Sequence, residues 1–163
     1  MVFAKIKSDG EINNNEVTKV NEILKEVFIK EKGYNEDFIF KQYEGKRYHV
    51  LLYEAVTEEE LIAYGSLIIN GNSADIVLLA VKESYRGKKY GDLITRMLID
   101  KALSSSYNNI YVDLPNYLIS MFKKIGFYKI EDSEDREENV NKPLIYDIRL
   151  KFDMNRPISC KKV

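Results

Sequence analysis

The sequence has one cysteine, one histidine and no tryptophan among its 163 residues. Because the single cysteine, Cys160, cannot form an intramolecular disulfide, a reducing, cytoplasmic setting is favoured. Long hydrophobic runs are also absent, and the longest, Ile76–Val81, is far too short to span a membrane. The stretch Met1–Gly10 lacks the apolar core of a signal peptide. These absences predict a cytoplasmic protein with no membrane partner.

Neither sign of charge dominates the composition. The 25 Lys and Arg residues and 26 Asp and Glu residues give a formal net charge of -1, so no global field attracts nucleic acid. The 12 tyrosines are scattered and do not alternate with basic residues as a base-stacking surface requires. Hydrophobic residues make up 45% of the chain, which is enough for a core. We expect one domain over residues 1–163 and no nucleic-acid partner.

The N-terminal part of the chain predicts a strand followed by a helix. The alternation over Phe3–Lys7 is typical of a strand, and Asn15 is the predicted N-cap of the helix. Gly33 is placed to end that helix, and residues 34–46 show no clear pattern. Hydrophobic residues recur along the helix at spacings of three and four: Val17, Val20, Ile23, Leu24, Val27 and Phe28.

From Arg47 the period of the pattern changes to two, which predicts an antiparallel meander. Tyr48–Val56 and Leu61–Ile69 form a hairpin around the charged turn Thr57–Glu60. Asn70-Gly71 predicts a type I′ turn into Ala74–Val81, a strand apolar enough to be buried on both faces.

The C-terminal half predicts two helices and three strands. The overall order is β-α-β-β-β-α-β-α-β-β, an α/β fold with a mixed, mostly antiparallel central sheet flanked by helices. The predicted elements are a helix striped by Leu93, Ile94, Met97, Leu98 and Ala102, a strand Ile110–Leu114, a helix from Pro115 to Gly126, and strands Tyr128–Ile130 and Leu144–Phe152.

The most informative segment lies between the buried strand and the second helix. It reads Val81-Lys-Glu-Ser-Tyr-Arg-Gly-Lys-Lys-Tyr-Gly91. A glycine-containing loop that leads into a helix presents free backbone N–H groups to an anion, and here three positive side chains are added. A pyrophosphate suits such a loop, although the motif is neither a Walker loop nor a dinucleotide fingerprint. The alternative is a basic, solvated connection.

Two motifs in this half resemble a known family. Arg86-Gly-Lys-Lys-Tyr-Gly91 resembles the Arg/Gln-x-x-Gly-x-Gly/Ala motif of the GNAT superfamily of N-acetyltransferases, and Met121-Phe-Lys-Lys-Ile-Gly-Phe127 resembles a second segment of that family. The resemblance covers roughly Arg47 to Phe152. It implies a GNAT-like fold and an acetyl-CoA-dependent N-acetyltransferase, in which an amine attacks the thioester directly.

The resemblance also implies where acetyl-CoA binds. The pantetheine arm would pair with the strand ending at Val81, and the pyrophosphate would bind backbone N–H groups at the start of the next helix. The implied cofactor-binding residues are Leu79, Ala80, Val81, Arg86, Gly87, Lys88, Lys89, Tyr90, Gly91, Asn116 and Phe122.

Three positions depart from the family pattern. Lys89 replaces the first motif glycine, and Phe122 replaces a tyrosine that protonates the CoA thiolate in many members. Pro115 stands where an asparagine often contacts the cofactor, and Asn116 lies one place along. An acyl-CoA-binding module without transferase activity is therefore the alternative.

The sequence names a general base only weakly. Asp75 begins the central strand at a position where some members of the family carry a catalytic glutamate, and Glu83 is a second candidate by proximity. The structural alternative for Asp75 is an aspartate at the end of a hairpin. His49 lies on an alternating strand without the neighbours of a metal site, so no metal is expected.

The predicted acceptor is a small-molecule or peptide amine. The run Glu131–Glu138 contains six acids and one arginine, and such a rim would attract a cationic amine. It is alternatively a solvated loop, or a surface through which a small protein-interaction domain binds a basic partner. Edge strands make a homodimer an open expectation.

Overall fold

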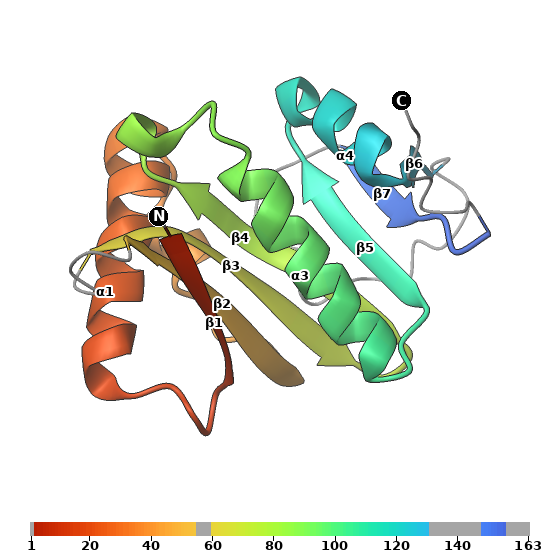
Figure 1. Ribbon diagram of the computed structural model, residues 1–163, viewed down its shortest axis with the longest axis horizontal. Coiled ribbons are helices and arrows are strands. Elements are labelled where there is room, and N and C mark those ends of the chain that lie inside the picture. Colours follow the sequence, from red (N-terminus) through yellow and green to blue (C-terminus); the bar gives the residue numbers. More distant parts are fainter. Residues whose placement is uncertain (1, 55–59, 131–147, 156–163) are drawn as a thin grey trace.

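The computed structural model describes residues 2–54, 60–130 and 148–155. Its centre is a seven-stranded sheet with strand order β1-β2-β3-β4-β5-β7-β6 (Figure 1). All neighbouring strands are antiparallel except β4 and β5. The strands are β1 (Val2–Ser8), β2 (Lys46–Glu54), β3 (Leu61–Asn70), β4 (Ser73–Val81), β5 (Asn109–Leu114), β6 (Phe127–Lys129) and β7 (Ile148–Phe152).

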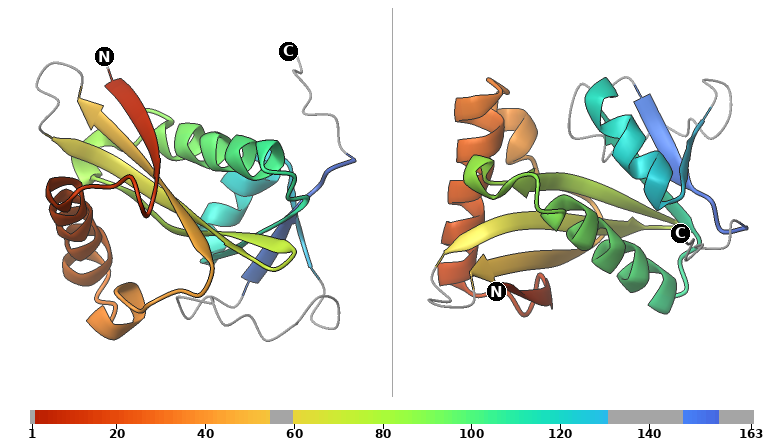
Figure 2. Two further views of the ribbon diagram at one scale, coloured as in Figure 1. Left: turned by 90° about the horizontal axis from the view of Figure 1, so that it is seen from below. Right: turned by 45° about the horizontal axis from the view of Figure 1, so that its top comes forward.

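Helices cover both faces of the sheet, as predicted (Figure 2). One face carries α1 (Asn14–Leu24), and the other carries α3 (Tyr90–Ser104) and α4 (Ile119–Ile125). Each face has its own hydrophobic core. Strand β4 contributes Ile76 to the core under α3 and Val77 to the core under α1, which confirms a strand buried on both faces. None of the described helices is long and apolar enough to cross a membrane.

The first helix starts two residues earlier than predicted. Asn13, not Asn15, is its N-cap: the Asn13 side chain accepts from the Glu16 N–H at 2.8 Å, and Glu16 accepts from the Asn13 N–H at 3.1 Å. This reciprocal pair needs a glutamate three residues after the cap, which Asn15 lacks. The predicted apolar stripe is buried except for Val17, which is 39% exposed.

The helix continues beyond α1 as a π-helical segment, η1 (Lys25–Glu31). Gly33 ends it as predicted, with a φ of 73° and an N–H that donates to the Ile29 carbonyl at 3.0 Å. The unassigned stretch that follows contains a short helix, α2 (Glu36–Ile39), capped by the Asn35 side chain.

The turn between β3 and β4 differs from the predicted type I′ turn. Asn70 pairs with Ser73, so Gly71 and Asn72 are the central residues. Of these two, only Gly71 has a positive φ, at 61°. Glycine at the first central position is typical of a type II′ turn, which joins strands of the same twist equally well.

A bulge interrupts β4 next to its centre. Tyr64 pairs with Ala80, whereas Ser66 pairs with Val77, so β4 has one residue more than β3 in this interval. Leu78 has a φ of 59°, which marks the extra residue. Opposite it, a Cβ on Gly65 would lie 2.6 Å from Ile94 Cγ2, so the glycine allows α3 to approach the sheet.

Several predicted segments fall partly or wholly outside the described residues. The acidic run at 131–138 and the tail with Cys160 lie wholly outside, as does most of the turn at residues 57–60. The predicted strand Tyr48–Val56 is described only up to residue 54, and Leu144–Phe152 only from residue 148. The helix after Pro115 begins as a 3-10 turn, η3 (Asn116–Leu118), and ends at Gly126 as predicted.

Candidate active site

Strands β4 and β5 pair at only one end. Their Cα register runs from Ser73–Asn109 to Ile76–Val112. Beyond Ile76, β4 continues to Val81 without a strand partner on this side among the described residues. The two strands diverge there (Figure 1), which exposes the backbone edge of residues 77–81 to a wedge-shaped opening. An extended ligand can bind such an edge as an additional strand would.

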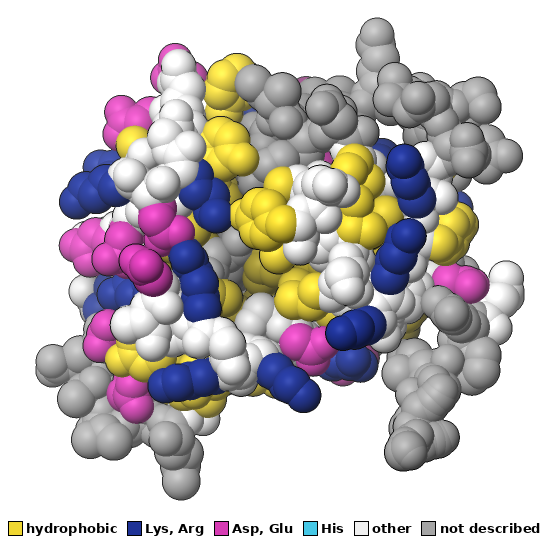
Figure 3. Space-filling model, turned by 90° about the horizontal axis from the view of Figure 1, so that it is seen from above, with side chains coloured by type: hydrophobic (Ala, Val, Ile, Leu, Met, Phe, Trp, Pro, Cys, Tyr) yellow, Lys and Arg dark blue, Asp and Glu magenta, His cyan; other side chains and the backbone are white. Residues whose placement is uncertain are grey.

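A pocket of about 400 Å³ lies at this opening. Figure 3 shows this face of the molecule, where Lys and Arg side chains surround a hollow with hydrophobic walls. The wall residues come from η1 and the residue after it, β4, the loop before α3, the N-terminal turn of α3, η3 and α4: Val27, Lys32, Leu79, Val81, Tyr85, Arg86, Gly87, Lys89, Tyr90, Gly91, Asp92, Tyr117, Leu118 and Met121.

The N-terminus of α3 opens onto this pocket without a side-chain cap. Its N-cap, Lys89, has a φ of 65°, a left-handed conformation that glycine adopts most readily. The first N–H groups of an α-helix have no partner within the helix. A Cβ on Gly91 would meet only Val81 Cγ2 at 3.8 Å and Met121 Cε at 4.0 Å, so space for a ligand remains beside these N–H groups. With Lys32 and Lys89 on the walls, the end of the helix suits an anion.

Arg86 is tied to two other segments. Its Nε donates to the Val81 carbonyl at 2.9 Å, and its two terminal nitrogens donate to the Glu31 carboxylate at 2.6 and 2.9 Å. The hydrogen bond to Glu31 raises the pKa of the Arg86 guanidinium further. Arg86 therefore holds the end of β4 against the end of η1, on the border of the pocket.

The structure brings most of the predicted cofactor residues to this pocket and leaves four of them off its walls. For all of the predicted residues, contact with a cofactor stays a prediction. Those on the walls are Leu79, Val81, Arg86, Gly87, Lys89, Tyr90 and Gly91. Those off the walls are Ala80, Lys88, Asn116 and Phe122.

Two of these four side chains lie in the hydrophobic cores. Ala80 is in the core under α1. Phe122 is fully buried and packs edge-on against Phe127, with ring centroids 5.3 Å apart. Its neighbour Met121 reaches the pocket instead. Asn116 is exposed at the start of η3, and the next residue, Tyr117, takes the place on the wall.

Sequence reasoning missed the side of the pocket that η1 forms. Lys32 Nζ donates to the Tyr117 hydroxyl at 2.8 Å, which joins the end of η1 to η3 across the opening. These residues are 85 positions apart, and neither belongs to a motif. No signal in the sequence brings them together.

Asp75 lies at the closed end of the wedge. It pairs with Tyr111 in the parallel register, and its Oδ1 accepts a hydrogen bond from Arg149 at 2.9 Å. The side chain is 4% exposed. Its role as general base stays a prediction. Glu83 is exposed in η2 (Glu83–Tyr85) and does not line the pocket.

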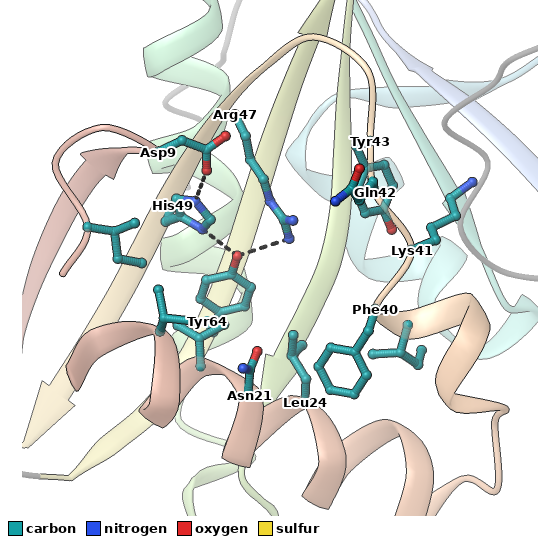
Figure 4. Close-up of a pocket in the computed structure, with 14 residues that line it drawn as sticks. Asp9, Asn21, Leu24, Phe40, Lys41, Gln42, Tyr43, Arg47, His49 and Tyr64 are labelled. Atoms are coloured by element: carbon teal, nitrogen blue, oxygen red, sulfur yellow. Dashed lines mark hydrogen bonds and ion pairs between the residues drawn. The ribbon is translucent and has the colours of Figure 1, made fainter. Parts of the chain in front are cut away.

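A second pocket, of about 430 Å³, lies on the face that carries α1. Its walls come from the loop before α1, from α1 itself, from residues 39–43, and from strands β2 and β3 (Figure 4). Leu24 lines this pocket and Val27, one turn further along the same helix, lines the first. The two pockets are therefore separated by about one helical turn at this point.

A chain of hydrogen bonds crosses the second pocket (Figure 4). His49 Nε2 is 2.6 Å from Asp9 Oδ1, and its Nδ1 is 2.6 Å from the Tyr64 hydroxyl. Arg47 donates to the same hydroxyl at 3.2 Å. An ionised carboxylate only accepts, so Nε2 carries the proton, and Nδ1 accepts from Tyr64. Such a chain can hold or relay one proton.

Burial sets the charge of His49. It lowers the pKa of His49 below the ordinary 6.5, and the hydrogen bond to Asp9 opposes the shift only in part. His49 is therefore neutral at pH 7. In the part of the chain that the structure describes, no three His, Cys, Asp or Glu side chains gather as a metal site requires.

Diverging parallel strands beside an uncapped helix N-terminus suit a ligand with an extended arm and an anionic end. The family model described as acetyltransferase (GNAT) family matches residues 17–127, more than half of the chain. The chain therefore belongs to the GNAT acetyltransferase family. A search of curated proteins found no match.

Solved structures share the fold at low sequence identity. ElaA from Escherichia coli is 16% identical with a TM-score of 0.77, over 94% of this chain and 100% of that one. An acyl-CoA N-acyltransferase from Pseudomonas aeruginosa is 14% identical with a TM-score of 0.75 and the same coverage. The PaiA N-acetyltransferase from Thermoplasma acidophilum, in complex with coenzyme A, is 15% identical with a TM-score of 0.66, over 93% and 99% of the two chains.

Proposed function

We propose that the protein transfers an acetyl group from acetyl-CoA to a primary amine. One observation carries the proposal: a single pocket joins the unpaired edge of β4 to the uncapped N-terminus of α3. The edge suits the amide groups of a pantetheine arm, and the helix end suits a pyrophosphate. The coenzyme A complex of the PaiA relative supports this choice of donor.

The reaction needs no covalent intermediate on the enzyme. The neutral amine attacks the thioester carbonyl carbon, a C–N bond forms and the C–S bond breaks. One proton leaves the amine, and the CoA thiolate takes up one. Phe122 has no hydroxyl and is buried, so it cannot supply that proton. Alkyl thiols, such as the cysteine side chain with its ordinary pKa of about 8.5, are acidic enough for the thiolate to be a fair leaving group without assistance.

Calorimetric titration of acetyl-CoA, without an acceptor, tests the donor site. We expect micromolar binding, followed by release of free CoA when amines are added. Binding without release in a broad panel of amines would favour an acyl-CoA-binding module. Absence of binding would contradict the donor site and favour a protein-interaction domain. The mass of the same preparation in solution tests whether the protein is a monomer or a homodimer.

A further inference from the structure

The second pocket contains two buried hydrogen-bonding groups without partners. Arg47 Nε and the Tyr43 hydroxyl are both inaccessible to solvent and make no hydrogen bond within the described residues. The guanidinium lies 5.1 Å from the centroid of the Tyr43 ring. Figure 4 shows the two side chains approaching the pocket from opposite sides. Because an unpaired buried polar group destabilises the structure, a ligand that satisfies both groups is favoured.

The charges of the pocket favour an anionic ligand. Two cations line it, Arg47 and Lys41, and both lie against the Tyr43 ring. Its one carboxylate, Asp9, is bonded to His49 and is 61% exposed. Because burial keeps His49 neutral, the groups on the walls carry a net positive charge. A carboxylate matches the donor geometry of a guanidinium.

The rest of the wall is mostly apolar and suits a hydrocarbon side chain. These residues come from the loop before α1, from α1 itself, and from the end of α2: Ile12, Val17, Val20, Leu24, Ile39 and Phe40. A polar head group beside Arg47 and an apolar remainder therefore fit the pocket together.

Arg47 is also connected to the wedge. It donates to Ser66 Oγ at 3.3 Å, and Ser66 donates to the Val77 carbonyl at 2.9 Å. Val77 is the first residue of β4 beyond its pairing with β5. A ligand held by Arg47 is thus two hydrogen bonds away from the strand that we propose to hold the acyl donor.

We propose that the second pocket binds the acceptor through a carboxylate, and that the acceptor is an α-amino acid with an apolar side chain. The carboxylate accepts hydrogen bonds from Arg47 Nε and the Tyr43 hydroxyl. The assignment of the second pocket as an acceptor site rests on the proposed function. It differs from the cationic acceptor that the acidic run at 131–138 predicted.

The test compares two amino acids, L-leucine and L-phenylalanine, with their amides, which keep the amine and lack the carboxylate. Binding is measured by calorimetry without acetyl-CoA. We expect each acid to bind about 10- to 100-fold more tightly than its amide, as for hydrogen bonds to a charged group. Equal or tighter binding of the amides would overturn the proposal. Absence of binding by the acids and the amides alike would also overturn it.

Variants locate the site. Tyr43→Phe and Arg47→Gln should weaken binding of leucine by about tenfold or more and leave the weak binding of leucinamide unchanged. Lys46→Gln is the matched control, because Lys46 lies on the same strand, is exposed and does not line the pocket. Equal losses in all three variants would contradict the assignment. Tyr43→Phe keeps the test valid if Arg47→Gln fails to fold.

Failure of this proposal is distinguishable from failure of the proposed function. Leucine binding without acetyl-CoA binding would overturn the transferase and leave the carboxylate site standing. Acetyl-CoA binding, with leucine and leucinamide acetylated at equal KM, would overturn the carboxylate site and support the transferase.

Discussion

Arg149 of β7 donates to the Asp75 carboxylate of β4 at 2.9 Å, across the intervening strand β5. Its other terminal nitrogen donates to Asp113 at 2.9 Å, and its guanidinium lies 4.3 Å from the centroid of the Tyr111 ring. Both carboxylate side chains are buried, at 4% and 6% exposure. One arginine therefore anchors two acids at the closed end of the wedge.

This arrangement makes Asp113 a matched control for Asp75. We expect Asp75→Asn and Asp113→Asn to destabilise the protein alike, by about 1–3 kcal/mol, because each removes one charged partner of Arg149. If Asp75 is only structural, both variants should change kcat by less than about threefold. A loss of kcat of about 10²–10⁴, confined to Asp75→Asn, would instead support Asp75 as general base. Denaturant unfolding and steady-state kinetics provide the two readouts.

Two substitutions of Gly91 that add side chains of equal size but different charge test the donor site. Gly91→Glu places a carboxylate beside the proposed pyrophosphate, and Gly91→Gln adds the same bulk without the charge. Both should fold, because the nearest protein atoms to a Cβ there are 3.8 Å and 4.0 Å away. We expect the glutamate to weaken binding of acetyl-CoA by at least about tenfold more than the glutamine. Equal affinities in a calorimetric titration would remove the pyrophosphate from this helix end.

The ion pair between Arg86 and Glu31 gives opposite predictions for its two members. If Arg86 also contacts the cofactor phosphates, Glu31 competes with them for the guanidinium. Glu31→Gln should then tighten binding of acetyl-CoA by a few-fold, whereas Arg86→Gln should weaken it by about tenfold. Both should change stability by no more than about 1 kcal/mol, because the pair is partly exposed. Weakening in both variants would show that Arg86 acts only by holding β4 against η1.

His49 makes stability depend on pH. The unfolded chain takes up a proton there as the pH falls through about 6.5, whereas the folded protein does so only at a lower pH. The contribution of neutral His49 is therefore complete above about pH 7 and declines as the pH falls below 6.5. His49→Gln removes the only histidine, so its Tm should fall less than that of the wild type between about pH 7 and pH 5. Parallel Tm profiles would contradict this assignment.

The fold was predictable where one local pattern dominates. The stripe from Val20 to Phe28 has a helical period, and the short apolar run of β4, which follows an Asn-Gly turn, suits a strand buried on both faces. The residues at which a helix begins or ends were less predictable. Asn13 and Asn15 are equally good caps by type, and Glu16 decides between them.

The candidate site was predictable on one side only. The glycine-containing loop carries its own signal, because helix start, glycines and basic residues are contiguous. No such sequence signal marks three contacts of the two pockets: Arg86–Glu31, Lys32–Tyr117 and Arg47–Tyr43. The first two join segments at least 55 positions apart, and the third depends on how a stretch without periodicity folds against β2. Such contacts follow from tertiary packing, which the local sequence does not encode.

The extra residue at Leu78 shifts the phase of β4. Before it, Ile76 belongs to the core under α3 and Val77 to the core under α1; after it, Leu79 packs toward α3 and Ala80 toward α1. In an uninterrupted strand Leu79 would share the face of Val77. Loss of one residue here would therefore exchange the faces of every later side chain in β4, including the two that line the first pocket. Natural variants of this domain are consequently expected to differ in this strand by substitution, while its length stays constant.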